Sequence, residues 1–190
     1  MKMLFKFAVA LVSIVLIGGA VALCGQDVKV DPEQPQKLLA AGSTTTLQLE
    51  LDKAGALGFH VISGTTRSNG EIVLLLERNV NAREQLQIKL IATTATGTFQ
   101  DEITKAARQG FRAVPGTLLN KPSGALIGNE IVVVLERPVN VARRYEYKIL
   151  ATNQTSALEA EWRVATTERY KTIGMLTRLE VMVLMERETR

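Results

Sequence analysis

The sequence predicts an α+β fold of three tandem βαββ repeats, each a three-stranded, mainly antiparallel sheet with one helix, packed into one body. The first observation is a strand-like stretch that recurs as EIVLLLER at 71–78, EIVVVLER at 130–137 and EVMVLMER at 180–187. The second is a constant spacing, because the lysine of KLLA, KLIA or KILA precedes an aromatic residue by 59 − 37, 111 − 89 and 170 − 148, which is 22 each time. The third is the step from the last arginine of one copy to the lysine of the next, 89 − 78 and 148 − 137, which is 11 both times.

These spacings set the predicted domain boundaries. They place repeat 1 at 37–78, repeat 2 at 89–137 and repeat 3 at 148–187, preceded by a signal peptide at 1–24 and a linker at 25–36. The linker is polar and contains two prolines, which is typical of a connecting segment. A single copy of about 40–50 residues is too small to bury much apolar surface alone, so we expect the copies to pack against one another.

The predicted signal peptide combines a basic start, MKMLFKF, with a short apolar stretch, AVALVSIVLIGGAVAL, and small residues after it. A buried helix and a permanent membrane anchor are the alternatives, and the short apolar run favours a cleaved leader over both. We therefore expect a periplasmic or secreted protein, which meets the membrane only through its signal peptide or a lipid anchor. Removing Lys2 and Lys6 with the leader reduces the net charge of +4 to 4 − 2 = +2. The remaining positive charges are interspersed along the chain, which argues against a nucleic-acid partner.

Cys24 is the only cysteine, so an internal disulfide is excluded. Its position after Leu23 resembles a bacterial lipoprotein signal, in which the cysteine is lipidated. That signal prefers a small residue where Leu23 stands, so ordinary cleavage after Ala22 is favoured. Anchoring in the envelope through a lipidated Cys24 remains the alternative.

Each copy is predicted to run strand, helix, strand, strand. Three stretches are interpreted as helix-capping boxes: 45–48 (TTLQ), 97–100 (GTFQ) and 156–159 (SALE). Gly58 and Gly110 are expected to end the first two helices in left-handed conformations, whereas Arg169 predicts a less sharp end for the third. Trp162 falls in the same helical position as Leu51 and Ile103, which predicts a core residue.

The recurring strand indicates how the copies pack. A helical crossover makes the first and second strands of a copy parallel, so the third strand is expected between them and antiparallel to both. In EIVVVLER, Ile131, Val133 and Leu135 face one side while Val132 and Val134 face the other, so both faces of the sheet are apolar. The second face must be covered, most simply by another copy. The first strand of repeat 1 follows Pro35 and is expected to be short and to lie at an edge.

Three motifs resemble a family of small bacterial domains of unknown function, each about as long as one repeat. They are YEYK at 145–148, Gly110-Phe111, and LER at 135–137. The resemblance spans 37–187 and implies a strand-helix-strand-strand order, with no functional residue to carry over. The third copy departs from it at Arg169, and the first lacks the aromatics of YEYK. The element order alone is also similar to that of dodecin, a small flavin-storing protein, and none of its ligand residues is carried over.

Few residues suggest chemistry. His60 is the single histidine, and Arg112 and Lys171 occupy its position in the other copies, so a basic surface position is expected rather than catalysis or a metal site. The recurring Glu-Arg pairs, such as Glu136-Arg137, are interpreted as charges at the end of an apolar strand, which are solvated or pair with a neighbour such as Lys89 or Lys148.

The segment between the aromatic residue and the last strand is longest in the second copy, and insertions collect in surface loops. It is the candidate contact site, with five residues expected to take part: Pro115, Leu118, Asn120, Lys121 and Leu126.

These features favour a non-enzymatic binding or scaffolding module of the bacterial cell envelope. The alternative is a carrier of a small ligand, a cofactor or metabolite, with an apolar pocket between repeats. An enzyme is the least supported class, and no cofactor or metal ligand set is predicted. The partner is either an envelope protein or a small ligand, and a homo-oligomer is an open alternative.

Overall fold

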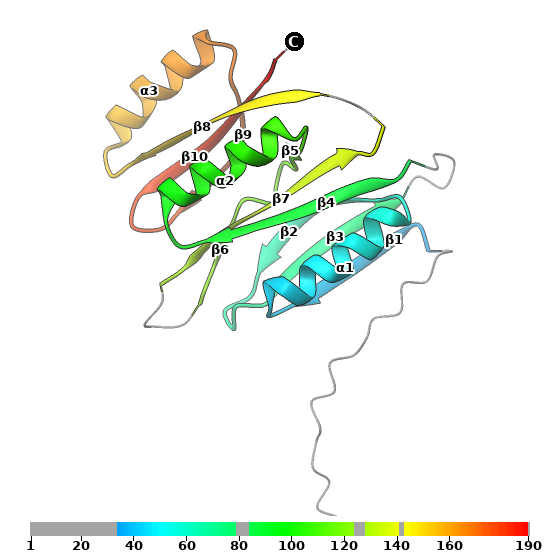
Figure 1. Ribbon diagram of the computed structural model, residues 1–190. Helices are drawn as coiled ribbons and strands as arrows, with labels where there is room; N and C mark the ends of the chain where they lie inside the picture. Colours follow the sequence, from blue (N-terminus) through cyan, green and yellow to red (C-terminus); the bar gives the residue numbers. More distant parts are fainter. Residues whose placement is uncertain (1–33, 79–83, 124–127, 141–142, 190) are drawn as a thin grey trace, which may run out of the picture.

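The computed structural model describes residues 34–78, 84–123, 128–140 and 143–189, which form an α+β structure (Figure 1). The predicted signal peptide, Cys24 and most of the linker lie outside these residues. The elements fall into a first segment, a second segment and a third segment. The first segment contains β1 (Gln36–Ala41), α1 (Thr44–Ala56), β2 (Phe59–Thr66) and β3 (Ile72–Arg78). The second segment contains β4 (Leu86–Thr93), α2 (Thr96–Arg108), β5 (Arg112–Ala113), β6 (Leu119–Lys121) and β7 (Glu130–Pro138). The third segment contains β8 (Arg144–Thr152), α3 (Thr155–Thr167), β9 (Lys171–Thr177) and β10 (Val181–Thr189).

Each segment forms its own antiparallel sheet. The strand orders are β1-β3-β2, β4-β7-β5 and β8-β10-β9, and β6 also pairs with β7. The strand that carries the recurring Glu-Arg pair is therefore central and antiparallel to its neighbours, as predicted. β1 is six residues long and lies at an edge, which confirms the expectation for the strand after Pro35. Within the described residues, no helix combines the length and apolar character needed to cross a bilayer.

The helix starts differ from the predicted capping boxes. The N-caps are Ser43, Ala95 and Gln154, two residues earlier than predicted, and only Ser43 accepts a backbone N–H, that of Thr46 at 3.5 Å. One reason is that Gln48, predicted to reach back to its own cap, has another partner. It lies against the second segment, where it donates to the Ile88 carbonyl oxygen at 2.8 Å and accepts the Leu90 N–H at 2.7 Å.

The helix ends are alike in all three segments. Gly58 and Gly110 adopt φ values of 79° and 86°, as expected for left-handed residues after a helix. Arg169 adopts the same conformation, with φ 68°. The prediction of a less sharp third helix end is therefore wrong: the backbone keeps the turn at a non-glycine residue, at a steric cost of about 1 kcal/mol.

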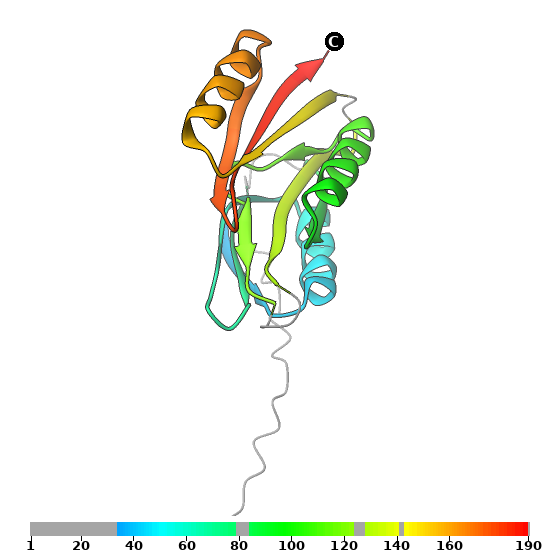
Figure 2. The same cartoon turned by 90° about the vertical axis from the view of Figure 1, so that its left-hand side faces the viewer.

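Neighbouring segments share their cores. We call the side of each sheet that carries its helix the helix face, and the other side the opposite face. One cluster joins the helix face of the first sheet to the opposite face of the second, including Val132 and Val134. A second cluster joins the helix face of the second sheet to the opposite face of the third, including Tyr147 and Leu184. α1 and α2 thus each share their sheet face with the next segment, and the helices follow one another across the molecule from α1 to α3 (Figures 1 and 2).

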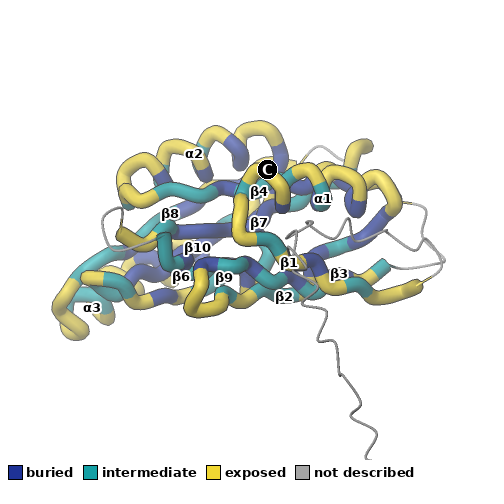
Figure 3. The backbone as a smooth tube through the Cα atoms, turned by 90° about the horizontal axis from the view of Figure 1, so that it is seen from below, coloured by how far each residue is buried: buried dark blue, intermediate teal, exposed yellow. Residues whose placement is uncertain are grey.

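The helix face of the third sheet differs from the other two. In the described part of the chain, its cluster contains only third-segment residues, among them Leu150, Ala165 and Met185. Leu51 and Ile103 are fully buried, but Trp162, in the matching position, is 42% exposed. The prediction that Trp162 is a core residue is therefore wrong, because the surface that buries its counterparts belongs to the following segment. Along α3 most of the chain is exposed (Figure 3).

Candidate functional site

The recurring arginines do not simply return to water. The guanidinium groups of Arg78, Arg137 and Arg187 lie 5.2, 4.8 and 4.7 Å from the ring centres of the aromatic residues that follow each helix. Arg137 also donates to the Gln109 carbonyl oxygen at 2.6 Å, and Arg187 donates to that of Glu168 at 3.2 Å. The arginine at the end of each central strand therefore packs on an aromatic ring by a cation–π contact, and in two segments it also binds the carbonyl end of the helix.

The recurring glutamates bind the preceding segment. Glu136 accepts the backbone N–H of Val61, and its other oxygen lies 3.2 Å from Nδ1 of His60. Only 14% of the Glu136 side chain is exposed. The expectation that these charges are solvated or pair with Lys89 or Lys148 is thus wrong for Glu136, because it lies in the interface between the first two segments.

Glu186 repeats this arrangement one segment later. It accepts Nε of Arg112 at 2.9 Å and the Tyr147 hydroxyl at 2.8 Å, and that hydroxyl accepts the Ala113 N–H at 2.6 Å. Glu186 is 5% exposed. The glutamates of the second and third segments therefore connect each segment to the one before it, which the sequence interpretation missed. The signal was present, because His60 and Arg112 occupy equivalent basic positions.

The contacts of Glu136 and Glu186 contribute to pKa changes at two side chains. The hydrogen bond to Glu136 raises the pKa of His60 above its ordinary value. Burial, followed by the nearby Glu186 charge, raises the pKa of Tyr147, so its hydroxyl stays protonated and donates. His60 is half exposed, and within the described residues no group of three His, Cys, Asp or Glu side chains could hold a metal. Both clusters are suited to joining segments.

The predicted contact loop is largely engaged inside the molecule. Leu118 and Lys121 are buried, and Lys121 donates to Glu130 at 2.8 Å. The backbone carbonyl oxygen of Asn120 accepts the Thr66 hydroxyl of the first segment, and its side-chain amide donates to the Thr177 carbonyl oxygen of the third. Pro115 is exposed, and Leu126 lies outside the described residues. The structure thus places the insertion as a brace between the first and third segments, and an outside partner for it stays a prediction.

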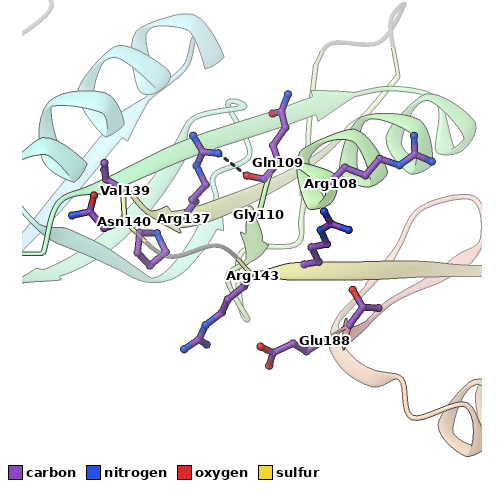
Figure 4. A pocket seen from close by; sticks show the side chains of 11 residues that line it. Arg108, Gln109, Gly110, Arg137, Val139, Asn140, Arg143 and Glu188 are labelled. Carbon is purple, nitrogen blue, oxygen red and sulfur yellow. Dashed lines mark hydrogen bonds between the residues drawn. The ribbon is translucent and has the colours of Figure 1, made fainter.

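A pocket of about 1070 Å³ lies where the ends of four elements meet (Figure 4). The pocket is bordered by the C-terminal ends of α2, β7 and β10 and by the start of β8. Gly110 lets the backbone at Arg143 come close to the end of α2. A Cβ atom on its left-handed backbone would lie only 3.1 Å from the Arg143 carbonyl oxygen. The lining residues are Arg108, Gln109, Gly110, Arg137, Pro138, Val139, Asn140, Arg143, Arg144, Glu188 and Thr189.

The charge of this arginine pocket is strongly unbalanced. Its lining contains four arginines and one glutamate, so 4 − 1 gives an excess of three positive charges. Arg137 is already fixed by Phe111, Gln87 and the Gln109 carbonyl oxygen. Arg108, Arg143 and Arg144 are exposed to solvent at the rim. Guanidinium groups bind carboxylate and phosphate oxygens in a fork-like geometry, so the pocket is suited to a ligand with several negative charges.

The sequence contained part of this signal. Arg137, Arg143 and Arg144 lie in one short run, RPVNVARR, but the charges were interpreted as interspersed. Arg108 comes from the end of α2 and joins them only because of the fold. Comparisons with protein-family models, with curated proteins and with solved structures find no match.

Proposed function

We propose that this chain is a non-enzymatic, extracytoplasmic binding protein of the bacterial cell envelope, which recognises an anionic group through the arginine pocket. The observation that carries the proposal is the excess of guanidinium groups at a meeting point of the second and third segments. Guanidinium groups stay protonated at all physiological pH values, so they suit binding and orientation rather than proton transfer. The pocket borders two segments, which is a common place for a ligand site.

The three segments are, in this proposal, copies of one βαββ repeat. Support comes from the constant sequence spacings, from the shared strand order and from the equivalent positions of Glu136 and Glu186. Export rests on the leader at 1–24. Mass spectrometry of the mature N-terminus tests it: cleavage after Ala22 supports a soluble protein, and a diacylglyceryl group on Cys24 would replace that with a lipid-anchored one.

The binding proposal can be tested with simple anions. We expect pyrophosphate or citrate to raise the thermal unfolding temperature and to give a saturable heat of binding by isothermal titration calorimetry. The double variant Arg143→Ala/Arg144→Ala should weaken binding at least ~10-fold, since two charge-assisted contacts are lost. Arg163→Ala removes an exposed arginine of α3 that is paired within its own helix, and it is the matched control.

Affinity for these anions should also fall as salt is added, because the rim arginines are exposed. Binding that is equal in the double variant and in the wild type would contradict the assignment of the site.

The alternative, a small-ligand carrier, is favoured by a neighbouring cavity of about 340 Å³. Its lining includes apolar groups from the second and third segments, such as Leu86, Val114 and Tyr145. It shares Gly110, Pro138 and Arg143 with the arginine pocket. A thermal-shift screen with flavins and other metabolites distinguishes the two functions. A shift of several degrees with a flavin, alongside no response to simple anions, would replace the first proposal with the carrier.

A further inference from the structure

The helix face of the third segment retains the features of an interface, and among the described residues no other segment covers it. Trp162 is 42% exposed and Met175 is 65% exposed, although both lie on this face. Their counterparts in the first segment are Leu51, which is fully buried, and Gly64, against which Leu119 of the second segment packs. What covers this face in the first two segments is in each case the opposite face of the next one.

The opposite face of the first segment has the complementary features. Leu38 is 61% exposed and Ile62 is 46% exposed. The matching residues of the later segments pack into the shared cores: Leu90 and Val114 in the second, Ile149 and Ile173 in the third. The two ends of the molecule thus present the two halves of a contact that occurs twice within the chain.

The charged groups of that contact are also present at both ends. Within the chain, a basic residue at the start of one segment's second strand meets the recurring glutamate of the next, as His60 meets Glu136 and Arg112 meets Glu186. At the ends, Lys171 holds the basic position and Glu77 the acidic one, and both are exposed. Their charges are opposite, so the pair suits a head-to-tail contact between molecules.

We propose that the helix face of the third segment binds the opposite face of the first segment of a second copy of this chain, in the relation that adjacent segments have within one molecule. Lys171 then pairs with Glu77 of the neighbouring copy, and Trp162 and Met175 pack near its Leu38 and Ile62. The two surfaces differ, so the contact is heterologous and can continue from copy to copy. The inference uses the proposed repeat and is independent of the arginine pocket.

Two residues that differ from their counterparts in the other segments make this contact weaker than the contacts within the chain. Gln36 stands where Ile88 and Tyr147 enter the shared cores, which reduces the apolar area. Glu159 stands where Gln48 and Gln100 reach the backbone of the next segment, and a carboxylate cannot donate to a carbonyl group. Polar changes at terminal repeats are typical of repeat proteins and limit their growth. The assembly is therefore reversible and depends on concentration.

The proposal is tested by sedimentation velocity of the mature protein, purified after its host has processed the N-terminus. We expect the mean mass to rise with concentration past that of a dimer. Emission of Trp162, the only tryptophan, should shift to shorter wavelength over the same range as its exposed ring is buried. A protein that stays monomeric up to the highest soluble concentration, or stops at a dimer, would overturn the head-to-tail contact.

Charge reversal tests the docking surfaces directly. Lys171→Glu and Glu77→Lys should each weaken association several-fold, because each places like charges in contact. An equimolar mixture of the two variants should restore it, because every contact between unlike variants joins opposite charges. Lys105→Glu makes the same charge change on the exposed side of α2 and should leave association unchanged. Association that survives Lys171→Glu undiminished would show that other surfaces are used, whatever the outcome of the anion-binding test.

Discussion

The two interfaces between segments use a glutamate at the same position but surround it differently. In the first interface, Glu136 meets a histidine whose side chain is 41% exposed. In the second, Glu186 is nearly enclosed and is held by an arginine and a buried tyrosine hydroxyl. The same backbone arrangement thus ties Glu136 to a histidine whose pKa is raised, and Glu186 to an arginine and a tyrosine whose raised pKa values keep both protonated.

The helices approach their partner strands differently as well. At Gly55 of α1, an added side chain would lie 2.5 Å from the Leu86 carbonyl oxygen of β4. At the matching position of α2 stands Ala107, whose side chain is almost fully buried in the core shared with the third segment. The first interface is therefore built around a close backbone contact, and the second leaves room for a methyl group.

The largest expected effect comes from removing the enclosed glutamate. Glu186→Ala leaves the buried Tyr147 hydroxyl and the Arg112 guanidinium without their acceptor, and we expect a loss of about 2–3 kcal/mol in the free energy of unfolding. Glu136→Ala should cost about 1–2 kcal/mol, because His60 is half exposed and can be solvated. Chemical denaturation measures both. Glu161→Ala, on an exposed position of α3, is the control, and equal losses at the two interfacial glutamates would remove the distinction drawn between the interfaces.

Gly55→Ala tests the closer helix contact. Alanine favours a helix by about 1 kcal/mol over glycine. The added methyl group must displace the β4 backbone, so we expect a net loss of about 1–2 kcal/mol in the free energy of unfolding. The reverse change at the second interface, Ala107→Gly, should cost about 1 kcal/mol or slightly more through lost propensity and burial. A stabilising Gly55→Ala would show that the two interfaces are equally tolerant.

The sequence predicted the arrangement of strands well because the pattern of each sheet is local. The helical crossover between the first two strands placed the recurring strand between them, and its two apolar faces correctly implied that the segments pack together. The left-handed glycines followed from their position after a helix. At Arg169, tertiary structure overrode residue preference and kept the turn.

What the sequence did not reveal depends on neighbours from other segments. Gln48 looks like a capping residue along the chain, yet the strand it binds lies in the following segment. Trp162 has the spacing of a core residue, but the surface that buries its counterparts comes from the following segment. Arg108 joins the arginine pocket only because α2 ends beside β8. In each case the missing information was the order in which segments stack.

The smallest effect should be a pH dependence confined to the first interface. The folded pKa of His60 is raised by its hydrogen bond to Glu136, so protonation stabilises the folded state. This contribution is fully present below the ordinary pKa of about 6.5 and is lost as the pH rises through the raised folded value. Subtracting the unfolding free energy of His60→Gln from that of the wild type should give a difference that shrinks with rising pH. NMR titration of this single histidine supplies the folded pKa directly. Arg112→Gln is the comparison, because an arginine stays charged and its effect on the free energy of unfolding should not change over the same pH range. If the effect of His60→Gln is equally independent of pH, the exposed imidazole is solvated rather than tied to Glu136.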